Sequence, residues 1–87
     1  MDYRDRAIEL ARNNFDDSIR IIKHLRDDNY ELITMATDEL EAKGDGLSYP
    51  VYCVNKNNNY EKFSIGILGL FDDYNFDNLV PNNMIEV

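Results

Sequence analysis

The first third of the chain carries apolar residues at three- and four-residue steps, which is the spacing of one face of a helix. Asp2 stands in front of this pattern, where its carboxylate can cap the first turn. The spacing predicts one long helix over residues 3–26. Its buried stripe is expected to comprise Ile8, Ala11, Phe15, Ile19, Ile22 and Leu25.

A second helix is predicted over residues 29–43. Asp28 followed by Glu31 resembles a capping box, and Gly44 can end the helix. The rival interpretation is a strand through "YELITMAT", because Ile and Thr favour sheets. The downstream "DELEAK" favours the helix. The apolar face of this helix would consist of Leu32, Ala36 and Leu40.

From Tyr49 onward the apolar pattern changes to a period of two, which predicts a β-hairpin. The turn is expected at "NKNNN", since Asn tolerates a left-handed backbone. Placing Val54 opposite Tyr60 sets the register. The pairs Val51–Phe63 and Tyr49–Ile65 then face inward, and Tyr52–Lys62 faces outward.

These elements predict a single α+β domain over residues 1–87. Two N-terminal helices would be followed by a two- or three-stranded antiparallel sheet, with the first helix packed across it. The last few residues supply the third strand, at an edge, because Pro81 interrupts any longer pairing.

Charge is the main compositional signal, because 17 acids face 9 Lys and Arg and leave a net charge of −8. The bases lie mostly in residues 1–26, so residues 27–87 form an acidic body. An acidic body repels phosphate, which disfavours direct binding to nucleic acid and favours a basic partner protein. A plain solubility role for the charge is the alternative interpretation.

Two acidic groups are candidates for binding such a partner. One group closes the second predicted helix, and the other lies in "FDDYNFDN", where Tyr74 supplies an aromatic anchor. The alternative for the second group is a turn in which Phe71 and Phe76 enter the core. The candidate residues are Asp38, Glu39, Glu41, Asp45, Asp72, Asp73, Tyr74 and Asp77.

Asp73, Asn75 and Asp77 match the first three ligand positions of a calcium loop. The rest of that pattern fails, because Asn78 replaces the glycine and Met84 replaces the bidentate glutamate. We therefore expect no metal and no cofactor. These three residues remain weak candidates for a cation-dependent switch.

The sequence does not predict an enzyme. His24 is expected on the charged side of the first helix, and Cys53 is expected to be a small buried residue of the hairpin. No common nucleotide or zinc motif occurs. No run approaches the roughly 20 apolar residues of a membrane span, and a single cysteine fits a reducing compartment. We expect a cytoplasmic protein of a bacterium or of an infected host cell.

In size, acidity and Asn/Tyr-rich composition the chain resembles small acidic inhibitor proteins. These include phage proteins that block host defence nucleases and bacterial immunity proteins that cover a toxin. The resemblance implies a non-enzymatic inhibitor whose carboxylates occupy phosphate positions on a basic, nucleic-acid-binding partner. The alternative is an assembly module that forms a homodimer through a sheet edge or through Leu10 and Ile21 of the first helix.

Overall fold

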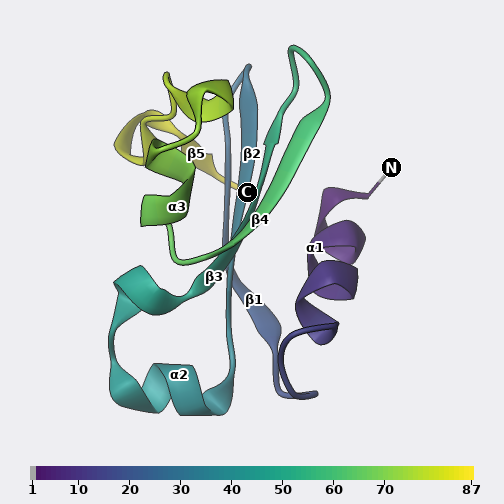
Figure 1. Ribbon diagram of the computed structural model, residues 1–87, viewed down its shortest axis with the longest axis vertical. Helices are drawn as coiled ribbons and strands as arrows, with labels where there is room; N and C mark the ends of the chain where they lie inside the picture. Colours follow the sequence, from purple (N-terminus) through teal and green to yellow (C-terminus); the bar gives the residue numbers. More distant parts are fainter. Residues whose placement is uncertain (1) are drawn as a thin grey trace.

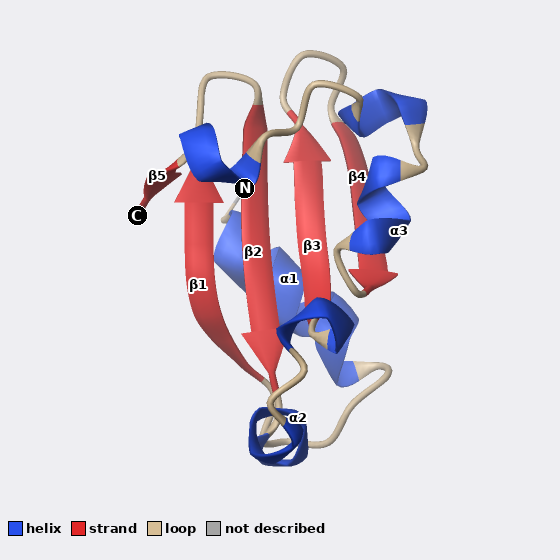
Figure 2. Ribbon diagram, turned by 90° about the vertical axis from the view of Figure 1, so that its left-hand side faces the viewer, coloured by secondary structure: helices blue, strands red, loops and turns tan. Residues whose placement is uncertain are grey.

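Five antiparallel strands form one sheet in the order β4-β3-β2-β1-β5. The structure is a computed structural model that describes residues 2–87. Helix α1 covers one face of the sheet, and the segment that follows β4 covers the other (Figures 1 and 2). The elements are α1 (Tyr3–Arg12), β1 (Arg20–Arg26), β2 (Tyr30–Ala36), α2 (Asp38–Lys43), η1 (Gly46–Ser48), β3 (Pro50–Asn55), β4 (Tyr60–Ile65), α3 (Leu68–Phe71), η2 (Tyr74–Phe76), η3 (Pro81–Asn83) and β5 (Ile85–Glu86).

The predicted helix over residues 3–26 is wrong beyond Arg12, because residues 20–26 form strand β1. Asp2 caps α1 as predicted, with its side chain accepting from the backbone N–H of Arg4 (2.9 Å). The apolar residues of β1 fit either period, so spacing alone cannot separate a helix from a strand here. Residues 20–26 form a strand because they pair with β2, with His24 opposite Ile33.

The second predicted helix is also wrong over most of its length, since residues 30–36 form β2 and only 38–43 are helical. The rival strand interpretation was therefore correct. Asp27 accepts hydrogen bonds from the backbone of Asn29 and Tyr30 (both 2.7 Å) and so forms a β-turn between β1 and β2 instead of a helix start. Thr37 caps α2 by accepting from the backbone N–H of Leu40 (3.2 Å).

The predicted hairpin is present, but its register is shifted by one residue. Asn55 pairs with Tyr60, so the turn spans only residues 56–59, with Asn59 at φ 55°. The extra residue stays in the strand because the Asn55 side chain is buried and donates to the Asn75 carbonyl (2.7 Å). Val51 and Phe63, expected on one face, therefore lie on opposite faces of the sheet.

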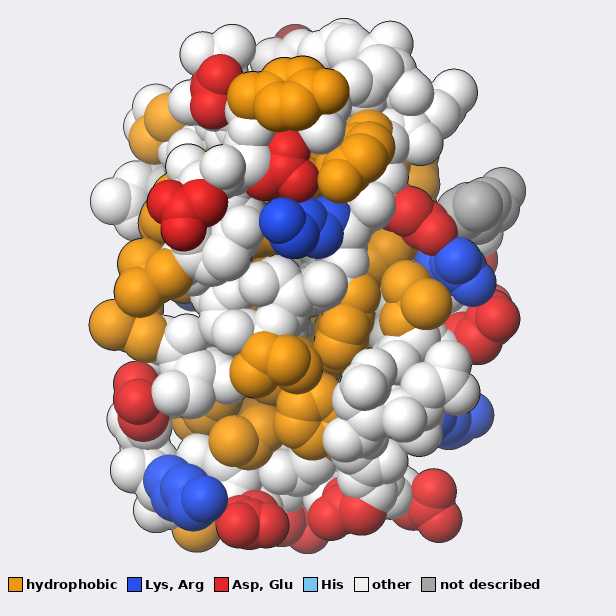
Figure 3. All heavy atoms as spheres, in the orientation of Figure 1, with side chains coloured by type: hydrophobic (Ala, Val, Ile, Leu, Met, Phe, Trp, Pro, Cys, Tyr) orange, Lys and Arg blue, Asp and Glu red, His pale blue; other side chains and the backbone are white. Residues whose placement is uncertain are grey.

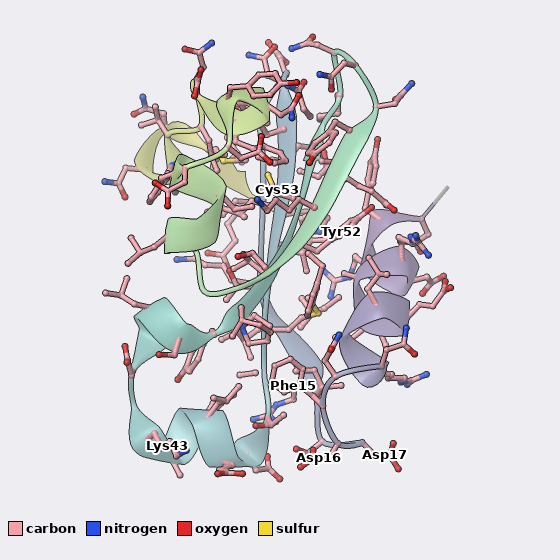
Figure 4. The ribbon with its side chains drawn as sticks, viewed as in Figure 1. Phe15, Asp16, Asp17, Lys43, Tyr52 and Cys53 are labelled. Atoms are coloured by element: carbon pink, nitrogen blue, oxygen red, sulfur yellow. The ribbon has the colours of Figure 1, made fainter. Side chains whose placement is uncertain are left out.

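The sheet separates two apolar clusters. Tyr52 points toward α1 and Cys53 toward the C-terminal segment (Figure 4). Leu10 and Ile21 are partly buried against the cluster under α1, so they are not the spare surface expected for a dimer. The buried members under α1 are Ala7, Ala11, Ile19, Ile33, Met35, Tyr52 and Val54, and those on the other face are Tyr30, Leu32, Val51, Cys53, Leu70, Phe76, Leu79 and Met84.

The C-terminal residues add an edge strand, as predicted, and this strand lies beside β1. Leu25 pairs with Glu86 and Arg26 pairs with Ile85. The sheet therefore has five strands, and the prediction of two helices followed by a two- or three-stranded sheet is wrong.

The turn after β4 depends on a residue without a side chain. Gly66 has φ 96°, and a Cβ built on it would lie 2.7 Å from the carbonyl oxygen of Leu47. We expect Gly66→Ala to lower the free energy of unfolding by about 2 kcal/mol, measured by urea denaturation. Gly46→Ala is the matched control, because its Cβ would meet nothing within 4 Å. Equal stabilities of the two variants would contradict this account of the turn.

Candidate interaction surface

The end of the molecule that carries α2 gathers acids from two separate segments. The loop before β1 brings Asp16 and Asp17 next to α2 (Figure 4). Ser18 links the two segments, because its hydroxyl donates to Asp16 (2.6 Å) and accepts from the backbone N–H of Asp38 (3.2 Å). We name Asp16, Asp17, Asp38, Glu39, Glu41 and Asp45 the acidic pole; all six are exposed.

The bases of this region do not neutralise the acidic pole. Arg20 binds Asp38 (2.9 Å) and Glu41 (2.6 Å), and Lys43 binds Glu39 (3.2 Å). Six acids therefore share two bases, and the surface remains acidic (Figure 3). Hydrogen bonds from the Ser18 hydroxyl and backbone hold the pKa of Asp16 below its ordinary value. All six carboxylates are accessible to a partner.

The two predicted acidic groups do not form one cluster. Asp38, Glu39, Glu41 and Asp45 belong to the acidic pole. The group around η2 lies at the opposite end of the molecule, whose longest dimension is 33 Å (Figure 1). We name Asp72, Asp73, Tyr74 and Asp77 the distal group. Sequence reasoning missed Asp16 and Asp17 because it placed them inside a helix.

Within the distal group, Asp73 has a structural role. Its carboxylate caps η2 by accepting from the backbone N–H of Asn75 (2.9 Å), and it also binds Lys62 (3.3 Å). These contacts, the Asn75 backbone first, hold the pKa of Asp73 below its ordinary value. Tyr74 remains 80% exposed, so it is accessible as an anchor. Phe76 enters the core, whereas Phe71 stays 47% exposed.

Two of the three candidate cation ligands, Asp73 and Asn75, are hydrogen-bonded to each other. The side-chain amide of Asn75 donates to Asp73 (2.9 Å), and its oxygen accepts from Asn58 (3.3 Å). Across residues 2–87, no three His, Cys, Asp or Glu side chains lie together as metal ligands would. The side chains of Asp73 and Asn75 thus take part in the hydrogen bonds of the turn.

A buried carboxylate that the sequence analysis did not single out lies near the start of β2, the middle strand of the sheet. Glu31 is 1% exposed and accepts from His24 Nε2, Arg26 Nε and Lys56 Nζ, each at 2.7 Å. Burial alone would raise the pKa of Glu31, but the hydrogen bonds from Arg26, Lys56 and His24 outweigh it and lower that pKa. Throughout residues 2–87, every buried side-chain nitrogen or oxygen has a hydrogen-bond partner.

His24 is buried in β1 and not on a charged helix face, which corrects the sequence prediction. Arg4 Nη1 lies 3.3 Å from His24 Nδ1, and a guanidinium can only donate, so Nδ1 accepts and Nε2 donates to Glu31. Cys53 lies on the opposite face of the sheet, where burial raises its pKa to about 12. The two side chains do not form a nucleophile pair.

A second internal network ties α1 to β4. Arg6 Nη2 donates to Glu61 (2.7 Å), and the Tyr52 hydroxyl donates to the same carboxylate (2.6 Å). These bonds, that of Arg6 first, lower the pKa of Glu61. A hollow of about 610 Å³ beside it is lined by Asp2, Asp5, Arg6, Glu9, Asn59 and Glu61. Arg6, the one base in this lining, is already paired with Glu61.

Comparison with protein-family models, with curated proteins and with solved structures finds no match to this chain. None of the helices described in residues 2–87 is long and apolar enough to cross a membrane.

The buried carboxylate predicts how stability changes with pH. The pKa of Glu31 is lowered in the folded state, so its contribution is present above its unfolded pKa of about 4.3 and is lost as the pH falls below that value. We expect Glu31→Gln to lower the free energy of unfolding by about 2 kcal/mol at pH 7, because three donors lose a charged acceptor. The difference from the unsubstituted protein should shrink at about pH 3.

Urea denaturation at both pH values measures this effect. Glu39→Gln is the matched control, because that side chain is 74% exposed. A difference that stays the same at both pH values would show that the charge of Glu31 does not contribute.

Proposed function

We propose that this protein is a non-enzymatic inhibitor that binds a basic, nucleic-acid-binding surface of a partner protein. The observation that carries the proposal is the acidic pole, which the fold assembles from two segments and leaves under-neutralised. A surface of this charge attracts Lys- and Arg-rich surfaces and repels nucleic acid.

The proposed mechanism is substitution of carboxylates for phosphates. Both are anionic groups with several acceptor oxygens, and both form charge-assisted pairs with arginine. Asp17 and Glu39 are exposed, and Glu39 has only a surface contact with Lys43 (3.2 Å). Such carboxylates can exchange a weak internal contact for a partner's guanidinium at little cost.

The internal chemistry supports a binding role over catalysis. His24 has both ring nitrogens engaged and is 3% exposed. Burial of Cys53 keeps its thiol protonated at neutral pH. Lys56 and Arg26 hold the buried Glu31. These groups stabilise the sheet, and the accessible charge lies elsewhere. The free thiol is consistent with the cytoplasmic location, in a bacterium or an infected cell, that we propose.

Self-assembly through a sheet edge is the second candidate, and one observation favours it. β4 has a strand partner on one side only among residues 2–87. The net charge of −8 opposes the association of two identical acidic copies. The protein alone should therefore remain monomeric in light scattering.

Charge reversal tests the proposed function. The immobilised protein is used to capture proteins from a nuclease-treated bacterial lysate, which are then eluted along a salt gradient. We expect Asp17→Lys/Glu39→Lys to weaken retention of the captured partner by about tenfold at low salt, because these charges steer and hold a basic surface. The added Lys residues replace exposed side chains, so the fold should persist.

The matched control is Asp28→Lys/Glu86→Lys. It makes the same change in net charge at exposed positions on the β1–β5 side of the sheet. Retention should be close to that of the unsubstituted protein, and added DNA should compete with the protein for the partner. Equal losses in both double variants, or a partner that DNA does not displace, would refute nucleic-acid mimicry.

A further inference from the structure

The outer edge of β4 has no strand partner along its whole length in the described part of the chain. β5 pairs with only the last two residues of β1, Leu25 and Arg26, and the rest of the β1 edge is made irregular by a bulge between Ile21 and Lys23. β4 pairs with β3 in an unbroken register from Pro50–Ile65 to Asn55–Tyr60. It contains no proline. Regular, uncovered edges offer unpaired backbone donors and acceptors to any extended segment that reaches them.

Charged side chains often guard such an edge, but those of β4 are turned away. Glu61 is bound over the α1 face by Arg6 (2.7 Å) and Tyr52 (2.6 Å). Lys62 is bound over the other face by Asp73 (3.3 Å). Each charge is therefore tied to an element that lies above or below the sheet, and neither protects the edge.

Apolar side chains flank the β4 edge. Edge strands that are protected against association carry charged side chains at such positions. Ile65 is 63% exposed at the end of β4, and Leu68 is 59% exposed on α3. Leu47 of η1 is 61% exposed, and its backbone adjoins the Gly66 turn. The view onto β4 shows apolar side chains across the middle of this face, with acids gathered at both ends (Figure 3). An added strand would gain apolar contacts as well as backbone hydrogen bonds.

The acidic groups lie beyond the two ends of β4. The Tyr60 hydroxyl lies 3.3 Å from Asp73 of the distal group. Ile65 pairs with Pro50, and residues 44–49 connect that position to α2 and the acidic pole. We propose that the β4 edge binds an extended segment of the basic partner, with an apolar centre and Lys or Arg at both ends, as a sixth strand of the sheet. This inference rests on the proposed function and specifies how the partner binds.

Charge complementarity selects a basic segment over a second copy of this chain. In an antiparallel β4–β4 pair about a twofold axis, the acidic pole of one copy would lie next to the distal group of the other. Both are acidic, so the approach is repulsive. A segment with basic ends meets opposite charge at both positions. An extended segment of about ten residues spans the 33 Å length of the molecule.

A defined peptide tests this directly. The probe is a fluorescent ten-residue peptide with a central Val-Thr-Val-Thr-Val-Thr and two Lys at each end. We expect it to bind by fluorescence anisotropy, more weakly at high salt, and to slow amide hydrogen exchange in Tyr60–Ile65. A peptide with Glu at both ends, and a Lys-ended peptide with a central Pro, should each bind at least about tenfold more weakly.

Two isoleucines provide matched variants of the protein. Ile65→Lys places a charge on the β4 edge, and Ile85→Lys makes the same change on β5, where the side chain is 75% exposed. We expect Ile65→Lys to weaken binding of the Lys-ended peptide by about tenfold and Ile85→Lys to change it by less than about twofold.

The outcomes separate the two proposals. Binding that weakens in Asp17→Lys/Glu39→Lys but not in Ile65→Lys, without protection of β4 amides, would overturn the edge site and leave the acidic binder intact. Binding lost in Ile65→Lys but equally strong for Lys-ended and Glu-ended peptides would overturn the charge-based function. A dimer of the protein alone that Ile65→Lys dissociates would show that a second copy occupies the edge.

Discussion

The fold depends on burying β2 on both of its faces. Six of its seven residues are buried, and only Thr34 is partly accessible. A chain of 87 residues hides a limited share of its surface, so it needs a cover on each side of this strand. Helix α1 provides one cover, and the segment from α3 to η3 provides the other. Both covers are short, and neither would be stable without the sheet.

Burying β2 also buries Glu31, and this explains where the positive charges of the protein lie. An unpaired carboxylate at that position would be strongly destabilising. Arg26 and Lys56 neutralise it, Arg6 neutralises Glu61, and Lys62 binds Asp73. Four of the nine Lys and Arg residues therefore serve these pairs. Nine of the 17 acids lie in the acidic pole and the distal group, at the two ends of the molecule.

The sequence correctly predicted those elements whose local pattern is compatible with only one structure. The Asn-rich turn, the hairpin that it joins, the cap at Asp2 and the C-terminal edge strand all carry local signals that no competing structure shares. Residues 20–26 and 30–36 do not, because runs of Ile and Leu fit a helix or a strand equally well until a neighbouring strand pairs with them. Because one helix was predicted over residues 3–26, Asp16 and Asp17 were not assigned to the acidic pole and His24 was expected on the surface. The secondary structure of these residues is determined by pairing between strands, which no local sequence pattern records.

The path of the C-terminal segment explains why the outer edge of β4 has no strand partner. The C-terminal segment crosses from β4 to β1 over one face, and its last residues pair with one end of β1 as β5 (Figure 2). After that crossing, no strand in residues 2–87 pairs with the outer edge of β4. Edge strands left in this way normally carry charges or bulges against association. In β4, Glu61 is bound to Arg6 of α1 and Lys62 to Asp73 beside η2, so neither charge guards the edge. The acidic pole and the distal group, beyond the two ends of β4, are the charges that remain to oppose association. In the binding mode that we propose, these acids repel other copies of this acidic chain and attract a basic segment, so the same charges would protect the edge and select its partner.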